Sequence, residues 1–495
     1  MKTKQIAAML LAVLMASGTF ISCENKTQAE TETTADTAAA ETMETEEADP
    51  FAGMDFGGED IRMMVSSEDK YDMISSKITI IHEEELTGEV VSDAVYNRNI
   101  LVEDLLNIKL NFTEDGQNQE TISNTITQLI TAGEDAYDLI IHVLFPLANL
   151  SVQNSFLNVM DMPHLDFSQD YWYEDYMNDV SFGSEEKQYI LAGDYFMDIL
   201  RTAHALYFNK DRFTNLYGAP EKLYELVLEG DWTHDVFLQY SEGAYQDVNG
   251  NGNRDADDLY GYSTYGYWGP MIPWVIGADI TFLKYKEDGA PYFAMNNERS
   301  VKLLEQLNSI FHGEGTFDYT DKYYDAFING SSLFGGFLWV AHLETFRDME
   351  ADLGILPIPK MDDAQETYIT SSHDTTNVGA IPITCTKADT MAVVLEVISR
   401  ETAKSVLPAY YETALKNKYA RDDYSAQILD VIRENISCAF PVAFGNYCEN
   451  MPLYNAFSAL LKNKSTDFVS NYVKYEAGAQ AKLDELWTAF NSVDN

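Results

Sequence analysis

The chain has 495 residues, of which 46% are hydrophobic and 13% aromatic. It is too long for one compact core and predicts roughly two to four domains or lobes. The formal net charge of -48, from 80 acidic and 32 basic side chains, would repel a nucleic-acid backbone and argues against nucleic acid as a partner. So acidic a surface is typical of a protein kept soluble outside the cell or in salt, and attraction of cations is the alternative.

The first 22 residues have the pattern of a secretory signal peptide. Lys2 and Lys4 precede an apolar run over residues 6–14, and small residues lead to F-I-S-C, which ends at Cys23. The run is too short to span a bilayer of about 30 Å, and no other stretch approaches the ~18 to 20 continuous apolar residues of a span. The sequence therefore predicts an exported protein that has no transmembrane helix after removal of residues 1–22.

The segment that follows resembles the start of a mature bacterial lipoprotein. F-I-S-C is similar to the lipobox, although Phe20 stands where a leucine is usual. A Glu/Thr/Ala tract comes next and cannot bury enough apolar area to order itself. The resemblance implies that Cys23 is lipidated and that residues 23–58 form an acidic, disordered linker to the cell membrane. Plain secretion is the alternative.

Strands and helices alternate in the first part of the folded body, which is expected to begin near Glu59. D-I-R-M-M-V predicts a strand, apolar residues at helical spacing predict a helix from Val90 to Leu106, and a strand follows from Ile108 to Phe112. Residues 122–130 predict an amphipathic helix closed by Gly133, and Y-D-L-I-I-H-V predicts a buried strand of the parallel type. The alternation predicts an α/β fold with a doubly wound sheet.

The second part of the body repeats this mixture. A-L-Y-F-N-K, from Ala205 to Lys210, predicts a strand, and Thr233 is expected to cap the next helix. Proline-punctuated runs over residues 353–360 and 378–384 predict strands at sheet edges or crossings. One face of the last helix is expected to pack on the core through Leu483, Leu486, Trp487 and Phe490.

Three cysteines remain beyond Cys23. Cys385, Cys438 and Cys448 are too few for a disulfide scaffold and lack metal-ligand spacing. The sequence leaves two alternatives, a disulfide bridge between Cys438 and Cys448 or free thiols.

Residues 247–258, D-V-N-G-N-G-N-R-D-A-D-D, have the spacing of an EF-hand-type calcium loop, with Gly252 at the sharp turn. The expected ligands are Asp247, Asn249, Asn251, Asn253, Asp255 and Asp258. Three carboxylates predict a modest affinity, suited to the calcium concentration outside cells, and a structural role. The alternative is a turn cluster whose side chains cap their own backbone.

The order of these landmarks resembles the extracellular solute-binding proteins of ABC importers, of the carbohydrate-type, family 1-like group. A-L-Y-F-N-K, followed by D-R-F and G-D-W-T-H-D-V-F, is similar to that family's first crossing between lobes. D-L-G-I-L-P-I-P-K-M-D-D-A-Q and L-P-A-Y-Y-E-T-A-L-K-N-K-Y-A-R-D look like the return crossing and the C-terminal helices. The resemblance implies a type II, two-lobed, periplasmic-binding-protein-like α/β fold that closes about hinge crossings. The implied divisions are an N-terminal lobe from 59–204, a C-terminal lobe over 205–358, and a return segment with C-terminal helices over 359–495.

The resemblance also implies a function. A monomer is expected to bind a sugar, oligosaccharide or other small solute between its lobes and to deliver it to an ABC permease. Aromatic faces would stack on the C–H patches of a sugar while polar groups bind its hydroxyls. The expected ligand-binding residues are Tyr267, Trp268, Trp274, Phe337 and Trp339, with Ser66, Ser67, Glu68, Asp194 and Tyr195 from the N-terminal lobe. For each aromatic residue, packing in the core is the alternative.

A secreted glycosidase and a surface lectin or receptor without a transport role are the rival functions. The chain contains no G-x-S-x-G, H-E-x-x-H, Walker or G-x-G-x-x-G motif, and H-E-E-E-L at His82 lacks the second histidine of a zinc helix. The sequence therefore favours a binding protein without catalytic residues.

Overall fold

The computed structural model describes residues 49–67, 77–81, 85–346, 351–416 and 423–493. The predicted signal peptide, Cys23 and Glu68 lie outside the described residues. The chain divides into two compact units, Met1–Asp49 and Pro50–Asn495, and the second contains the fold described below. Within the described part of the chain, no helix combines the length and the apolarity needed to cross a bilayer.

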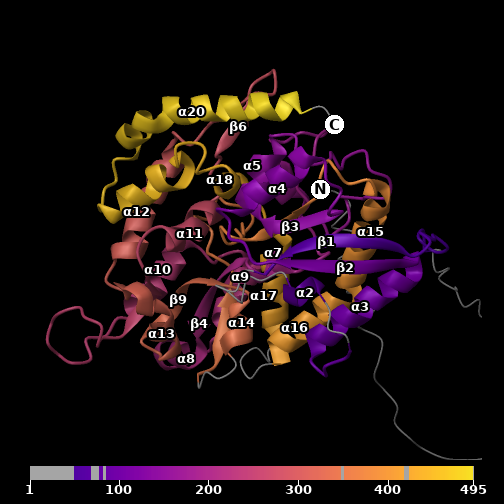
Figure 1. Cartoon of the computed structure of the whole chain (residues 1–495). Coiled ribbons are helices and arrows are strands. Elements are labelled where there is room, and N and C mark those ends of the chain that lie inside the picture. The colour runs from indigo at the N-terminus through magenta and orange to yellow at the C-terminus, as the bar shows by residue number, and fades with distance from the viewer. Residues whose placement is uncertain (1–48, 68–76, 82–84, 347–350, 417–422, 494–495) are drawn as a thin grey trace, which may run out of the picture. The chain divides into compact units, whose positions relative to one another are not determined.

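The first sheet has four strands in the order β11-β3-β1-β2 (Figure 1). β1 (Glu59–Ser66) pairs in parallel with β2 (Ile108–Asp115) and with β3 (Leu139–Val143), and every residue of β3 is buried. These three strands and their parallel pairing confirm the prediction. β11 (Asn377–Ala380) returns from much later in the chain and pairs antiparallel with β3.

Two helices of this sheet begin and end where the sequence predicts. α3 (Val90–Leu106) begins after Glu89, whose side chain accepts a hydrogen bond from the Ser92 backbone N–H, and it ends at Asn107 in the left-handed conformation. α4 (Ile122–Ala132) ends at Gly133, which is also left-handed. The caps at both ends of α3 and at the C-terminal end of α4 satisfy backbone groups that would otherwise lack partners, which fixes these boundaries.

The second sheet has five strands in the order β10-β4-β9-β5-β8. β4 (His204–Asn209) pairs antiparallel with β9 (Ser332–Trp339) and with β10 (Leu353–Leu356), whereas β5 (Tyr260–Thr264) is parallel to β9 and to β8 (Thr316–Asp318). β10 and β11 are the edge strands of their sheets, as predicted. Both are shorter than expected and end before Pro357 or Pro382, because proline has no N–H for the ladder.

The remaining elements include α-helices and a separate antiparallel pair of strands, β6 with β7. Their bounds are α2 (Lys77–Ile80), α5 (Leu144–Ser151), α6 (Glu174–Val180), α7 (Asp198–Arg201), α8 (Lys210–Tyr217), α9 (Glu221–Glu229), α10 (His234–Gly243), α11 (Ile272–Gly277), α12 (Glu298–His312), α13 (Tyr323–Ile328), α14 (His342–Thr345), α15 (Ala388–Glu401), α16 (Leu407–Lys416), α17 (Asp423–Glu434), α18 (Phe440–Ala443), α19 (Ala459–Lys462), α20 (Phe468–Ser492), β6 (Leu283–Tyr285) and β7 (Pro291–Phe293).

Two sequence predictions about helices are confirmed here. The Thr233 side chain accepts a hydrogen bond from the Val236 backbone N–H at the start of α10. On α20, Leu483, Leu486 and Phe490 are buried. Trp487 on the same face is half-buried, so the helix packs through most of the predicted stripe.

Two chain segments that connect the sheets lie side by side. The backbone N–H of His204 donates to the Ser371 carbonyl at 2.8 Å, and that of His373 donates to the Thr202 carbonyl at 2.9 Å. The hydroxyls of Thr202 and Thr376 are 2.5 Å apart. Residues 201–204 and 370–376 thus form a paired crossing, held by backbone hydrogen bonds that do not depend on side-chain identity.

The structure shows the bonding state of the three described cysteines. Cys385, Cys438 and Cys448 are free thiols, and Cys438 and Cys448 form no bridge. Burial raises the pKa of the Cys448 thiol to about 12, which keeps it protonated and unreactive.

Candidate functional site

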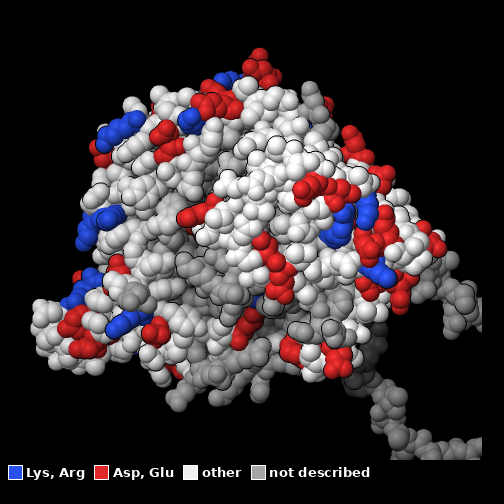
Figure 2. Space-filling model, in the orientation of Figure 1, with Lys and Arg blue, Asp and Glu red and all other residues white. Residues whose placement is uncertain are grey.

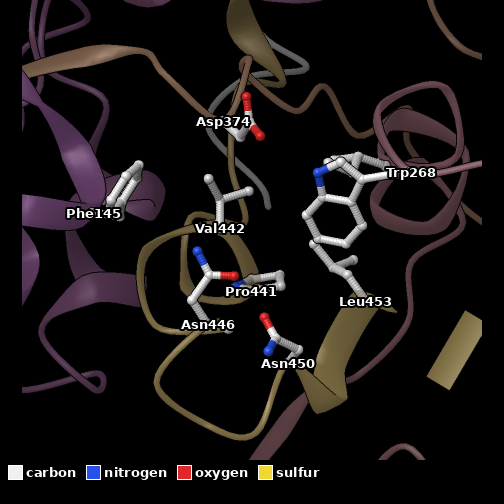
Figure 3. Close-up of a pocket in the computed structure, with 10 residues that line it drawn as sticks. Phe145, Trp268, Asp374, Pro441, Val442, Asn446, Asn450 and Leu453 are labelled. Atoms are coloured by element: carbon white, nitrogen blue, oxygen red, sulfur yellow. The ribbon is translucent and has the colours of Figure 1, made fainter. Parts of the chain in front are cut away.

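A pocket opens beside the paired crossing (Figure 3). Its cavity volume is about 30 Å³, room for one or two water molecules, so a sugar would need the pocket to open further. Four separate stretches of the chain contribute to it. The lining residues are Phe145, Trp268, Ile272, Asp374, Pro441, Val442, Gly445, Asn446, Asn450 and Leu453.

Trp268 supplies the largest apolar surface of the pocket. Its side chain stands on the side opposite Phe145 (Figure 3) and is 37% exposed, an unusual state for an indole. Gly269 packs so closely on Phe337 that an added Cβ would come within 2.7 Å of the phenyl ring. This close approach fixes the turn that carries Trp268 against β9.

Asp374 and two amides supply the polar groups. The side chains of Asn446 and Asn450 lie on the side of the pocket away from Asp374 (Figure 3). Both asparagines are exposed, and within the described ranges neither amide has a side-chain hydrogen bond to protein. Two amides and a carboxylate around apolar faces can bind hydroxyl groups while the aromatic rings contact C–H surfaces.

A cluster of histidines and aromatic rings lies behind Asp374. The His373 ring centroid lies 4.8 Å from that of Trp339 and 5.4 Å from that of Phe337. The His204 ring lies tilted against Phe337 with centroids 5.5 Å apart, and the His342 ring contacts Trp339 edge-to-face with centroids 4.3 Å apart. Burial lowers the pKa of His204 and of His342 to about 3, so both rings are neutral at physiological pH.

The aromatic residues predicted to bind ligand have different locations. Trp268 lines the pocket, whereas Phe337 and Trp339 lie in the cluster behind it. Trp274 is fully buried, with its indole N–H donating to the Tyr262 hydroxyl at 3.1 Å. Tyr267 is half-buried beside His312. A role in binding for the four aromatics outside the lining stays a prediction.

Of the polar residues predicted from the N-terminal lobe, the four that the structure describes do not line this pocket. Asp194 is buried and forms an ion pair with Arg433 at 2.5 Å. Tyr195 is buried and donates its hydroxyl hydrogen to the Leu191 carbonyl. Ser66 is buried at the end of β1, and the Ser67 backbone N–H donates to the Asp115 carbonyl.

Sequence reasoning missed several pocket residues, above all Phe145, Asp374, Asn446 and Asn450. They belong to stretches without a family motif. The one available signal for Asp374 was the polar run S-S-H-D-T-T immediately before a strand expected at a crossing.

The loop over residues 247–258 is folded by its own acidic side chains. Asp247 accepts hydrogen bonds from the backbone N–H groups of Gly250 and Gly252, at 2.7 and 2.9 Å. Asp258 is buried and accepts one from the Val248 backbone N–H. In the part of the chain that the structure describes, no group of three histidine, cysteine or acidic side chains converges as a metal site. A cation in this loop would therefore also need amide oxygens, such as those of Asn249 and Asn251.

Solved structures share the fold. A sugar transporter from Rhizobium etli in an open conformation has a TM-score of 0.55 at 13% identity, over 88% of this chain and 100% of that chain. A cyclo/maltodextrin-binding protein complexed with maltotetraose has a TM-score of 0.54 at 11% identity, over 90% and 98%. UgpB from Mycobacterium tuberculosis in complex with glycerophosphocholine has a TM-score of 0.52 at 14% identity, over 87% and 99%.

These likenesses show the fold and confirm the prediction of a two-lobed, periplasmic-binding-protein-like α/β architecture. Neither the protein-family models nor the curated proteins contain a match to this sequence.

Proposed function

We propose that this protein is an extracellular receptor that binds a small solute, a sugar or oligosaccharide, in the pocket at Trp268 and delivers it to an ABC permease. The exposed indole of Trp268 carries the proposal, because it faces a second aromatic ring across a cavity edged by unpartnered amides. That combination suits the alternating C–H and hydroxyl surfaces of a sugar. Several proteins of this fold, including the maltotetraose complex, bind sugars.

The lining of the pocket argues for a binder over a glycosidase. A typical glycosidase places two carboxyl groups on either side of the scissile bond. Among the described residues that line the pocket, Asp374 is the single carboxylic acid. The paired crossing at residues 201–204 and 370–376 is the natural hinge, about which ligand contacts from both sides would favour closure.

A thermal-shift screen against mono- and oligosaccharides, with product analysis of every hit, tests this function. A sugar that raises the melting temperature and is recovered intact supports the receptor. Recovery of a cleaved sugar would establish the glycosidase instead. Trp268→Ala should abolish the shift, whereas substitution of an exposed residue that does not line the pocket, such as Leu101→Ala, should preserve it.

Attachment to the membrane through Cys23 belongs to the same proposal. The lipobox-like F-I-S-C and the acidic tract after it support a lipid anchor with a long tether. Expression in a bacterial host with a labelled fatty acid is expected to label the wild-type protein in the membrane fraction. Cys23→Ser should appear unlabelled. Labelling that survives the substitution would contradict acylation at this cysteine.

We also propose that the loop over residues 247–258 binds calcium in a structural role. The alternation of carboxylate and amide side chains supports it, as does Gly252, whose φ of 73° suits the sharp turn of such loops. Melting in millimolar calcium should occur at a higher temperature than melting in chelator, and Asp247→Ala should remove the difference. An unchanged midpoint in the wild-type protein would leave only the turn held by Asp247.

A further inference from the structure

We propose that Asp374 makes the pocket selective by charge, so that it binds neutral and amine-bearing solutes and excludes anionic ones. The inference rests on the proposed binding function and specifies the class of solute. It depends on two features of the site, which are a rigidly held carboxylate and the absence of lysine, arginine and histidine among the described residues of the lining.

The backbone holds Asp374 in a fixed place. Residues 373–376 form a tight turn in which the Thr376 N–H donates to the His373 carbonyl at 3.1 Å. The turn is tied to the first crossing by the His373 N–H, and to α5 by the Leu144 N–H, which donates to the Thr376 carbonyl at 2.9 Å. A carboxylate on such a turn meets a ligand without first losing conformational freedom.

His373 does not neutralise this carboxylate. Its Nδ1 lies 3.1 Å from Oδ1 of Asp374, but the Thr375 backbone N–H points at the same nitrogen from 3.2 Å. The Thr375 hydroxyl also lies 2.8 Å from Nδ1, so this nitrogen has two hydrogen-bonding neighbours besides Asp374. Burial lowers the pKa of His373, although the Asp374 charge acts in the opposite direction. The lowered pKa favours the neutral ring.

No group among the described residues of the lining supplies positive charge. The described residues around the cavity include no lysine, arginine or histidine. The Asp374 side chain is 35% exposed, so a solute can reach it directly. On the face shown in Figure 2, acidic residues are spread widely while basic residues occur in a few small groups. The electrostatic potential over this face is therefore negative, as it is beside Asp374.

Hydrogen bonding at Asp374 acts in the same direction. A sugar that presents hydroxyl or ammonium hydrogens can donate to Asp374. An acidic sugar would instead place its charge near the Asp374 carboxylate, with no cation among the described residues of the lining to accept it.

A charge series on one sugar skeleton tests the inference. Glucosamine, glucose and glucuronate, together with the disaccharides chitosan dimer, cellobiose and cellobiouronate, are titrated by calorimetry into wild-type protein, Asp374→Asn and Asp363→Asn. Asp363 is exposed and outside the pocket, so its substitution is a matched control for the loss of one negative charge.

In wild-type protein, the amine is expected to bind at least as tightly as the neutral sugar, and the acid about tenfold or more weakly than the neutral sugar. In Asp374→Asn, the affinity for the acid should come to within about threefold of the affinity for the neutral sugar. Asp363→Asn should keep the wild-type order of affinities. Higher salt should reduce the difference in affinity between the neutral and the acidic sugar in wild-type protein, since the Asp374 charge is partly exposed.

Binding of the acid equal to that of the neutral sugar, or a gap that survives Asp374→Asn, would overturn the inference and leave the receptor function intact. Failure of every sugar to bind would overturn the proposed function as well.

Discussion

Arg201 and Glu344 form a bidentate ion pair, with Nε to Oε1 at 3.0 Å and Nη2 to Oε2 at 3.1 Å. Arg201 is fully buried at the end of α7, beside the first crossing, while Glu344 lies on α14. Tyr410 of α16, a helix that packs on α3, donates its hydroxyl hydrogen to the same Oε1 at 2.9 Å. The ion pair therefore connects the first crossing segment to α14 and, through Tyr410, to α16.

Removal of one partner of this pair should destabilise the protein strongly. Glu344→Ala leaves the buried Arg201 guanidinium without its bidentate acceptor, and the expected loss is about 3 kcal/mol in the free energy of unfolding. Glu485→Ala breaks an exposed pair with Lys482 and should cost less than about 1 kcal/mol. Urea unfolding of the two variants makes the comparison. Equal losses would show that the Arg201 network contributes no more than a surface pair.

Local sequence patterns predicted the elements well because the signals that fix them are local. The helix over Val90–Leu106 has its capping group at Glu89 and its stop at Asn107, both directly adjacent to it. The parallel pairing of β1, β2 and β3 followed from their apolar runs and the helices between them. Such information lies within a few residues of each boundary.

The pocket could not be predicted in this way. Phe145, Asp374 and Asn446 are far apart in sequence and meet only because the crossing segments pair with each other. Within Y-G-Y-W-G-P-M-I-P-W, Trp268 faces the pocket while Trp274 is buried. The turn at Gly269 decides which indole is exposed, and its direction depends on contact with Phe337 from a distant strand.

The buried histidines predict a loss of stability in acid. The pKa of His342 is about 3 in the folded protein against an ordinary 6.5, because of burial. The unfolded chain therefore takes up a proton first, so the stabilisation is complete above pH ~6.5 and declines as the pH falls from there toward ~3. Protonation would also disrupt the hydrogen bond that Nδ1 accepts from the Trp339 backbone N–H.

The free energy of unfolding should be lower at pH 5.5 than at pH 7.5 by about 1.4 kcal/mol for each such histidine. Urea unfolding of His342→Gln at the two values isolates this contribution from the titration of carboxylates. The variant is expected to lose about 1.4 kcal/mol less than the wild-type protein on acidification. An identical loss in both proteins would mean that His342 is protonated as readily in the fold as in the unfolded chain.

Two neighbouring tryptophans should separate binding from stability. Trp268→Ala removes an indole that is 37% exposed and makes an edge-to-face contact with Tyr454, so it should lower the free energy of unfolding by less than truncation of the fully buried Trp274 to alanine. The affinity for a bound sugar should fall by about thirtyfold, since truncation of a tryptophan at the centre of a binding site typically costs about 2 kcal/mol or more.

Trp274→Phe is expected to show the reverse behaviour. It removes the N–H that donates to the Tyr262 hydroxyl and leaves space in the core, at a cost of about 1 to 3 kcal/mol in stability. Sugar affinity of the folded protein should stay within about threefold of the wild-type value, because Trp274 does not line the pocket. Urea unfolding and calorimetric titration of both variants measure the two quantities independently. A large loss of affinity in Trp274→Phe with little change after Trp268→Ala would place the ligand against the buried indole and away from the pocket at Asp374.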